Sequence, residues 1–167
     1  MATDDRAIVA RQLGREPRAF RRVVVRCPYG LPAVTEQSPY DSVGEPFPTT
    51  YYLTCPYLVT AVSRLEAAGG VERWSVAARD DPVLTDSRAR ADEQQAALRR
   101  ELAGGAIGRD RGASLRLGVG GAARRGSLKC LHAHAAFALA QPEYALGRRI
   151  LAEVEPLWPS RCCTEVG

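Results

Sequence analysis

Residues 118–140, GVGGAARRGSLKCLHAHAAFALA, join a glycine-rich turn and a basic loop to an alanine-rich segment. The stretch holds the only two histidines of the chain, His132 and His134, and Cys130 lies two residues before the first of them. The alanine content and a stripe of leucines and alanines predict a helix over residues 128–140. On a helix Cys130 and His134 share one face, whereas His132 projects from another. An extended chain would place all three on one side, but the alanine run favours the helix and hence a Cys130/His134 pair.

Outward from this stretch, helical and strand patterns are intermixed along the chain. Apolar residues at helical spacing, together with capping residues, predict helices over residues 3–13, 56–68, 85–103 and 144–155. β-Branched and alternating segments predict strands over residues 21–27, 49–54, 71–78 and 115–119. This order predicts an α+β fold, a small mixed sheet packed by helices, with a small α/β sheet as the alternative. The length suits a single domain over residues 1–167.

Two segments are predicted to be irregular. Five prolines and two glycines fall between residues 28 and 48, which predicts a long loop. Structureless loops of this length in compact domains are usually functional or disordered, and we favour a functional one. The tail over residues 156–167 shows no pattern of helix or strand.

Composition excludes several classes of protein. The content of 46% hydrophobic and 25% charged residues is typical of a globular domain and argues against disorder. No apolar run approaches the roughly 18 residues that a membrane span needs. The charged N-terminus lacks the apolar core of a signal peptide, which predicts a cytoplasmic location. Five cysteines, an odd number without a CxxC pair, are then expected to be reduced thiols.

The glycine-rich turn and the basic loop suggest an anion site. Six basic side chains and one acidic one lie between residues 109 and 129, although the net charge of the whole chain is only +4. Backbone amides of glycines at a helix start favour phosphate groups. The candidate ligand-binding residues here are Gly118, Gly120, Gly121, Arg124, Arg125 and Lys129. Neither a dinucleotide nor a P-loop fingerprint is present, so an ordinary glycine turn with a solvated basic loop remains the alternative.

The second informative stretch is FPTTYYLTCP, residues 47–56. A strand followed by Pro56 at the first helical position makes Cys55 the expected N-cap of a helix. The field at a helix N-terminus lowers a thiol pKa, although an inert buried thiol is the better interpretation of Cys55 taken alone. Thr49 and Tyr51 are candidate ligand-binding residues of this strand. Because Tyr51 and Tyr52 point to opposite faces, we expect only one of them to line a pocket.

Three interpretations compete for Cys130 and His134. A metal site, with zinc as the candidate ion, needs a third ligand, for which Cys55 is the natural candidate. A thiolate nucleophile needs a base, which His134 would supply, and a positive setting, which Lys129 would supply. The third interpretation is a cysteine packed as a small hydrophobic residue, beside structural histidines.

The motifs of the chain resemble those of a bacterial, mainly actinobacterial, family called domain of unknown function 501. The motifs that carry the resemblance are LGREPR (13–18), RCPYGLPAV (26–34), EPFPTTYYLTCP (45–56), SRLEAAGG (63–70), GVGG (118–121) and KCLHAHAA (129–136). The resemblance implies no activity or cofactor. Family genes often lie near those for a division-septum protein and an exopolyphosphatase, which suggests envelope or polyphosphate biology.

The chain departs from the family pattern at two places. Family members tend to have an Asn-Pro-Val-Gly turn after the histidine helix, where this chain has QPEYALG at residues 141–147. Residues 89–100 also lack a histidine and a tyrosine that the family pattern leads us to expect.

From these patterns we expect FPTTYYLTCP and GVGG…KCLHAH to meet around one pocket that binds a phosphorylated or otherwise anionic small molecule. Cys130 and His134, together with His132, are the candidate catalytic residues, in a metal- or thiol-dependent hydrolase or transferase. Cys55, Cys130 and His134 are the candidate metal ligands. The alternative is a non-catalytic adaptor for a division or envelope protein, which predicts inert thiols and an exposed apolar groove. Nucleic-acid binding is not expected, because no motif accompanies the basic segment.

Overall fold

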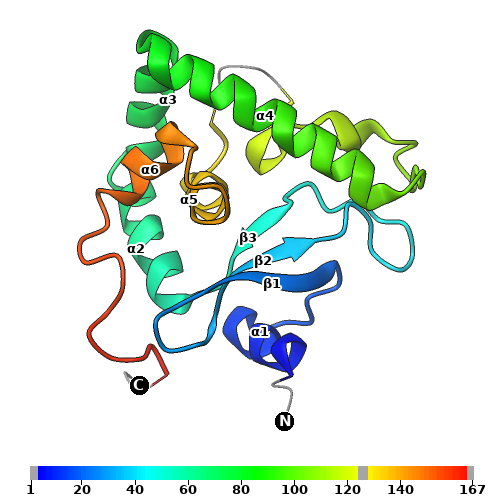
Figure 1. Cartoon of the computed structure of the whole chain (residues 1–167), viewed down its shortest axis with the longest axis horizontal. Coiled ribbons are helices and arrows are strands. Elements are labelled where there is room, and N and C mark those ends of the chain that lie inside the picture. The colour runs from blue at the N-terminus through cyan, green and yellow to red at the C-terminus, as the bar shows by residue number, and fades with distance from the viewer. Residues whose placement is uncertain (1–3, 124–127, 165–167) are drawn as a thin grey trace.

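The computed structural model describes residues 4–123 and 128–164 of the chain. Within these residues, six α-helices, three strands and two short 3₁₀ turns form an α+β fold, as expected (Figure 1). The elements in chain order are α1 (Asp5–Leu13), β1 (Phe20–Arg26), β2 (Pro32–Gln37), β3 (Tyr51–Leu53), α2 (Pro56–Ala67), α3 (Gly70–Asp80), α4 (Pro82–Ala103), η1 (Ala113–Arg116), η2 (Val119–Gly121), α5 (Leu131–Ala140) and α6 (Ala145–Leu151). None of the helices in these residues is long and apolar enough to cross a membrane.

The three strands form an antiparallel sheet in the order β1-β2-β3. The central strand β2 is buried along its whole length, which is the expected consequence of having a strand on each side and helices around it. In Figure 1 the sheet lies between α1 below and α4 above. Thr35 pairs with Tyr52 and Val34 pairs with Leu53, so the register of β3 follows from β2.

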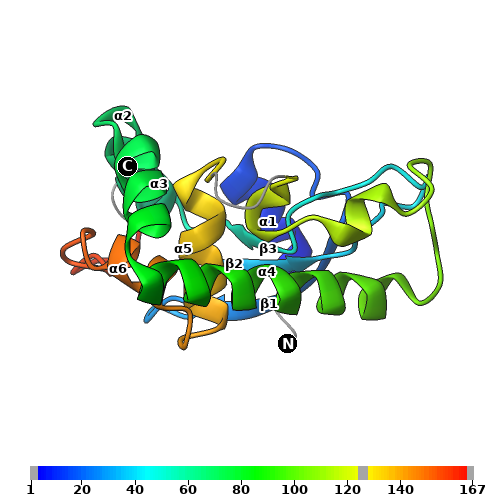
Figure 2. The same cartoon turned by 90° about the horizontal axis from the view of Figure 1, so that it is seen from above.

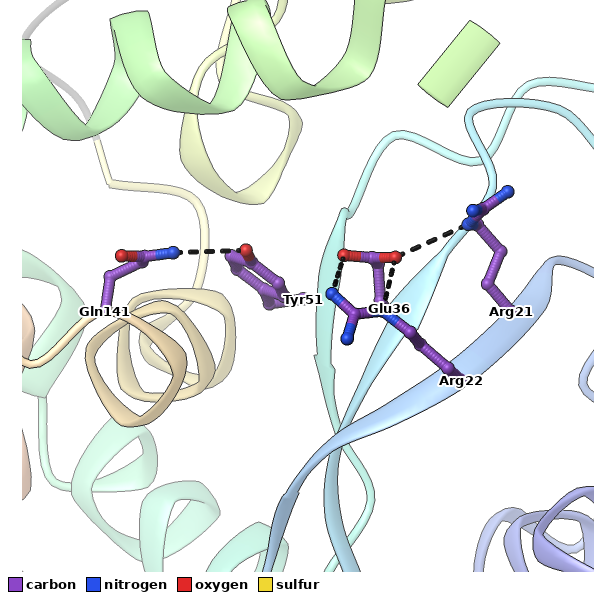
Figure 3. Close-up of polar contacts among 5 residues, drawn as sticks. All are labelled: Arg21, Arg22, Glu36, Tyr51 and Gln141. Carbon is purple, nitrogen blue, oxygen red and sulfur yellow. Dashed lines mark hydrogen bonds and ion pairs between the residues drawn. The ribbon is translucent and has the colours of Figure 1, made fainter. Parts of the chain in front are cut away.

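A buried carboxylate in β2 is neutralised from the neighbouring strand. Glu36 is only 2% exposed, and an unpaired charge at such a position would be costly. The Arg22 guanidinium of β1 donates to both carboxylate oxygens, at 3.0 and 3.2 Å, and Arg21 approaches one of them at 3.4 Å (Figure 3). Arginines of β1 therefore neutralise the buried charge of β2, in addition to the backbone hydrogen bonds that pair the two strands.

Helix α5 is the central element of the molecule. It packs against α6, α2, β3 and η2, and Figure 2 shows it behind the long helix α4. Its buried surface is mostly alanine, which allows neighbouring backbones to approach closely. At Gly147 of α6, a Cβ atom would lie 2.4 Å from the carbonyl oxygen of His134 and 2.6 Å from Ala138 Cβ. This contact therefore requires glycine.

Helix α4 contributes buried polar side chains that hold the loops of the molecule. Arg99 is fully buried, and its guanidinium donates to the carbonyl oxygens of Phe47 and Ser114. Burial lowers the Arg99 pKa, while Tyr40 and Asp110 work against that shift. The side chain thus joins the loop before β3 to the turn η1.

Two predicted strands are wrong. Residues 71–78 lie in α3, because Val71, Trp74 and Ala78 are spaced for one face of a helix, whereas the strand prediction relied on Trp74 and Val76 alone. Residues 115–119 lie across η1 and η2, where Gly112, Gly120 and Gly121 have positive φ angles and turn the chain.

The segment predicted as one long loop, residues 28–48, contains the strand β2. Pro32 is tolerated because it is the first residue of that strand. The helix predicted over residues 128–140 begins only at Leu131, and the helix predicted over residues 144–155 spans Ala145–Leu151. Residues 156–164 contain neither helix nor strand.

Candidate functional site

A cavity of about 520 Å³ lies where four segments of the chain meet. Its walls come from the end of α1, from β3 and its flanking residues, from the first turns of α2, and from the start of α5. The two sequence stretches around FPTTYYLTCP and KCLHAH therefore border the same space. The cavity has room for a small molecule.

The polar groups around this cavity are cationic or neutral. No Asp or Glu residue is among the described residues that line it, whereas Arg15, His132, Thr49, Thr60 and Cys130 are. Arg15 is an exposed residue, and its guanidinium lies over the Tyr52 ring, 5.9 Å from the ring centroid. One face of the guanidinium thus stacks on the Tyr52 ring, and N–H groups at its edge remain available to a ligand.

Tyr51 and Tyr52 both border the cavity, so the expectation that only one would do so is wrong. β3 is an edge strand, and the cavity opens beside that edge, where residues from both faces reach it. Tyr51 is buried, and its hydroxyl accepts a hydrogen bond from the Gln141 amide at 3.3 Å (Figure 3). Tyr51 therefore forms part of the wall, whereas Tyr52 is only half-buried.

Cys130 occupies the N-cap of α5 and is not part of the helix. Its backbone is extended, with φ −153° and ψ 151°, so it is not one helical turn from His134 on the same face. Burial raises the pKa of the thiol, the first-turn amides of Ala133 and His132 work against that shift, and Glu66 adds to it. The field of the helix is thus outweighed, and the thiol is the favoured form at neutral pH.

His134 lies in the core and does not line the cavity. Its Nδ1 atom is 2.6 Å from the Tyr144 hydroxyl, and among the residues that the structure describes its Nε2 atom has no hydrogen-bond partner. Burial, reinforced by the charge of Arg88, lowers the pKa of the imidazole to about 3. The predicted pairing of His134 with Cys130 is therefore not found.

Cys55 is the N-cap of α2, as predicted, and it is 3% exposed. Burial raises its thiol pKa, although the first-turn amides of Leu58 and Tyr57 oppose this, and its thiol neighbours are Cys27 and Cys163. The structure therefore does not join Cys55 with Cys130 and His134 as metal ligands. Across residues 4–123 and 128–164, no group of three or more His, Cys, Asp or Glu side chains is placed to hold a metal ion.

The GVGG turn is held by helix α4. The Asp92 carboxylate accepts the Val119 amide at 2.8 Å, and a Cβ atom at Gly118 would lie 2.4 Å from that carboxylate. Gly120 and Gly121 complete the turn, and Gly121 packs on Pro48. An acidic side chain thus occupies the position predicted for an anion, and the three glycines do not line the cavity.

The basic side chains of the neighbouring loop are only partly described. Arg124 and Arg125 lie outside the residues that the structure describes. Lys129 is exposed and directly precedes Cys130 in the chain. Its predicted contact with a ligand remains a prediction.

His132 lies at the junction of the cavity and α2. Its polar partners there were not among the predicted site residues. Its Nδ1 atom is 3.1 Å from Glu66 Oε1, and its Nε2 atom is 3.1 Å from Ser63 Oγ and 3.2 Å from the carbonyl oxygen of Val59. Glu66 Oε1 also accepts the Leu131 amide at 2.6 Å and so satisfies an amide in the first turn of α5. Ser63 and Glu66 both belong to the motif SRLEAAGG, which was the available signal.

A family model described as a protein of unknown function (DUF501) matches residues 23–152. The chain belongs to this family. The resemblance inferred from the motifs is thereby confirmed. The DUF501 match includes Ser63, Glu66 and His132, whereas Arg15 lies outside the matched residues. No curated protein and no solved structure is significantly similar to the chain.

Proposed function

We propose that the cavity beside β3 binds a phosphorylated or otherwise anionic small molecule. The observation that carries this proposal is the absence of any carboxylate among the described lining residues, in a space that Arg15 and His132 border. A guanidinium offers planar paired donors for a phosphate or carboxylate group. A cytoplasmic location, where thiols stay reduced and phosphorylated metabolites are available, is part of this proposal.

The neutral polar groups of the cavity support the same ligand class. Thr49, Thr60 and Tyr52 carry hydroxyl groups, which donate hydrogen bonds to phosphate oxygens without adding negative charge. The apolar wall formed by Leu53, Val59 and Ala133 suits the remainder of a metabolite. The proposal does not use a cysteine nucleophile, because burial raises the pKa of Cys130.

The test measures binding of inorganic phosphate, pyrophosphate and tripolyphosphate by calorimetry and by the shift in melting temperature. We expect Arg15→Ala to weaken binding about tenfold or more, because a charge-assisted hydrogen bond contributes roughly 1.5–3 kcal/mol. Arg18→Ala is the matched control, since Arg18 is also exposed but does not line the cavity. Equal affinity of wild type and Arg15→Ala, or no binding of any of the three anions, would overturn the proposal.

The second candidate is the non-catalytic adaptor for a division or envelope protein. The raised thiol pKa values of Cys55 and Cys130 favour it, because it predicts inert thiols. A groove of about 740 Å³ between α2 and the C-terminal segment, bordered by Tyr57, Leu65 and Val154, is the corresponding surface. Leu65→Glu in this groove should abolish partner binding and leave anion binding unchanged, and pull-down with each variant measures this.

A further inference from the structure

Ser63, His132 and Glu66 form a continuous chain of hydrogen-bonding groups between α2 and α5. Ser63 Oγ is 3.1 Å from His132 Nε2, and His132 Nδ1 is 3.1 Å from Glu66 Oε1. Ser63 and Glu66 lie three residues apart on α2, so both side chains leave the same face of that helix. The order hydroxyl, imidazole, carboxylate is the arrangement by which a histidine activates a serine.

The partners of the ring determine which nitrogen carries the proton. The Glu66 carboxylate can only accept, so Nδ1–H donates to it, and in the neutral ring Nε2 is left with its lone pair. This lone pair accepts the Ser63 hydroxyl proton. After proton uptake, Nε2–H has an acceptor in the Val59 carbonyl oxygen, 3.2 Å away. The site therefore satisfies the ring both before and after it takes a proton.

The position of the group makes it accessible to a ligand. His132 lines the cavity, with 26% of its side chain exposed, and Ser63 is exposed on α2. Val59 and Thr60, on the preceding turn of α2, also line the cavity. Arg15 and His132 border the same cavity, whereas Ser63 is not among its lining residues and adjoins it through His132.

We propose that Ser63 is the nucleophile of an acyl-transfer hydrolase, with His132 as general base and acid and with Glu66 as the residue that positions the ring. The inference rests on the proposed function, because the substrate class it names is an ester of an anionic small molecule. Ser63 Oγ forms a bond to the ester carbonyl carbon, and its proton passes to His132 Nε2. The alcohol leaves with that proton, and acyl-Ser63 remains. Water gives its proton to the same nitrogen and its oxygen to the acyl carbon, which releases the acid and restores the Ser63 hydroxyl.

The test uses a neutral alkyl fluorophosphonate, which phosphonylates activated serines with loss of fluoride. We expect a single adduct on Ser63 in the full chain, located by peptide mass spectrometry, and none in Ser63→Ala. In His132→Gln, labelling of Ser63 should be slower by a factor of about 100 or more, as expected when a general base is removed. Ser160→Ala is the control, because Ser160 is also exposed and neither histidine contacts it among the described hydrogen bonds.

A pH profile separates positioning by Glu66 from a merely structural role. Glu66→Gln keeps an acceptor for Nδ1–H but removes the negative charge, so the pH of half-maximal labelling should move to lower values. Melting temperatures of all variants identify those that fail to fold. The proposal is overturned if wild type gives no adduct on Ser63 while a reference serine hydrolase is labelled, or if His132→Gln is labelled as fast as wild type.

The two proposals fail in different experiments. The fluorophosphonate carries no charge and needs no anion site, so labelling of Ser63 is measured separately from anion binding, and Arg18→Ala, which lies outside the cavity, should label at the wild-type rate. Labelling that is lost while Arg15-dependent phosphate binding persists would remove the hydrolase and leave the binding function. Labelling that persists without anion binding would do the reverse.

Discussion

His132 and His134 are two residues apart on one helix, and the structure places them in opposite environments. Residues two apart lie roughly 200° apart around a helix, so the side chains face different neighbours. His134 is fully buried against Tyr144, whereas His132 reaches the cavity and contacts Glu66 and Ser63. The comparison shows that the packing around α5, and not the residue type, decides which histidine is reached from the cavity.

The two environments differ in the partners they offer. Around His134 there is one hydroxyl, and burial keeps the ring neutral by lowering its pKa to about 3. Around His132 there is a carboxylate for one nitrogen and two oxygen atoms for the other. His132 therefore has an oxygen partner at each ring nitrogen, whereas among the described residues His134 has a partner at Nδ1 only.

The largest expected effect is on stability. His134→Ala removes a fully buried ring and leaves the Tyr144 hydroxyl without its partner, so we expect the free energy of unfolding to fall by about 3 kcal/mol. His132→Ala should cost about 1 kcal/mol or less, since the side chain is partly exposed and Glu66 keeps the Leu131 amide as a partner. Urea denaturation of both variants measures the difference. Equal losses in the two variants would contradict the comparison.

The next effect is a dependence of stability on pH. The unfolded chain protonates His134 near pH 6.5, but the folded chain does so only near pH 3. Below pH 6.5 the unfolded state therefore binds more protons, and stability falls as pH falls, by up to about 1.4 kcal/mol for each pH unit. We expect a loss of about 1 kcal/mol between pH 6 and pH 5 in the wild type.

His134→Gln should flatten that slope, because glutamine does not titrate. Measurements between pH 5 and pH 7 keep the comparison free of Asp110, whose pKa of about 2 affects stability only at lower pH. Burial acts to raise that carboxyl pKa, and hydrogen bonds from Ser114, Tyr40 and Gly112 more than offset it. A slope that persists in His134→Gln would assign the acid sensitivity to another group.

The sequence predicted those helices whose ends and buried faces are determined by residues close together in the chain. The N-cap position of Cys55, the helix after Pro56 and the long helix that ends before Gly104 follow from caps and apolar spacing. Strand β2 was not predicted, because the prolines and glycines around it predicted a loop, and its Glu36 is tolerated in a buried strand only through Arg22 on the neighbouring strand. Nothing in residues 32–37 taken alone shows that partner.

The candidate site divides in the same way. The motifs predicted the two stretches that border the cavity, and Thr49, Tyr51, Cys130 and His132 do line it. The contact of Ser63 and Glu66 with His132 spans 69 and 66 positions of the chain, and spacing along a sequence carries no information about such a pair. The contact of the GVGG turn with Asp92 of α4 could not be read from the sequence for the same reason, and the glycines of this turn do not line the cavity.

The smallest expected effect on stability concerns the two N-cap cysteines, of which Cys55 is buried and Cys130 borders the cavity. Cys130→Ser should leave the free energy of unfolding within about 0.5 kcal/mol of wild type or raise it, because serine is a better N-cap and the site is only half-buried. Cys55→Ser should lower it by less than about 1 kcal/mol, since the cost of a hydroxyl in place of a thiol that is 3% exposed is partly offset by the better N-cap. Urea titration of both variants measures these free energies of unfolding. Cys55→Ala, which has no hydroxyl, shows how much of the loss at Cys55 comes from lost packing. If Cys130→Ser proved the more harmful, the cavity side of α5 would be as tightly packed as its core side, and the accessibility on which the Ser63–His132 chemistry depends would be lost.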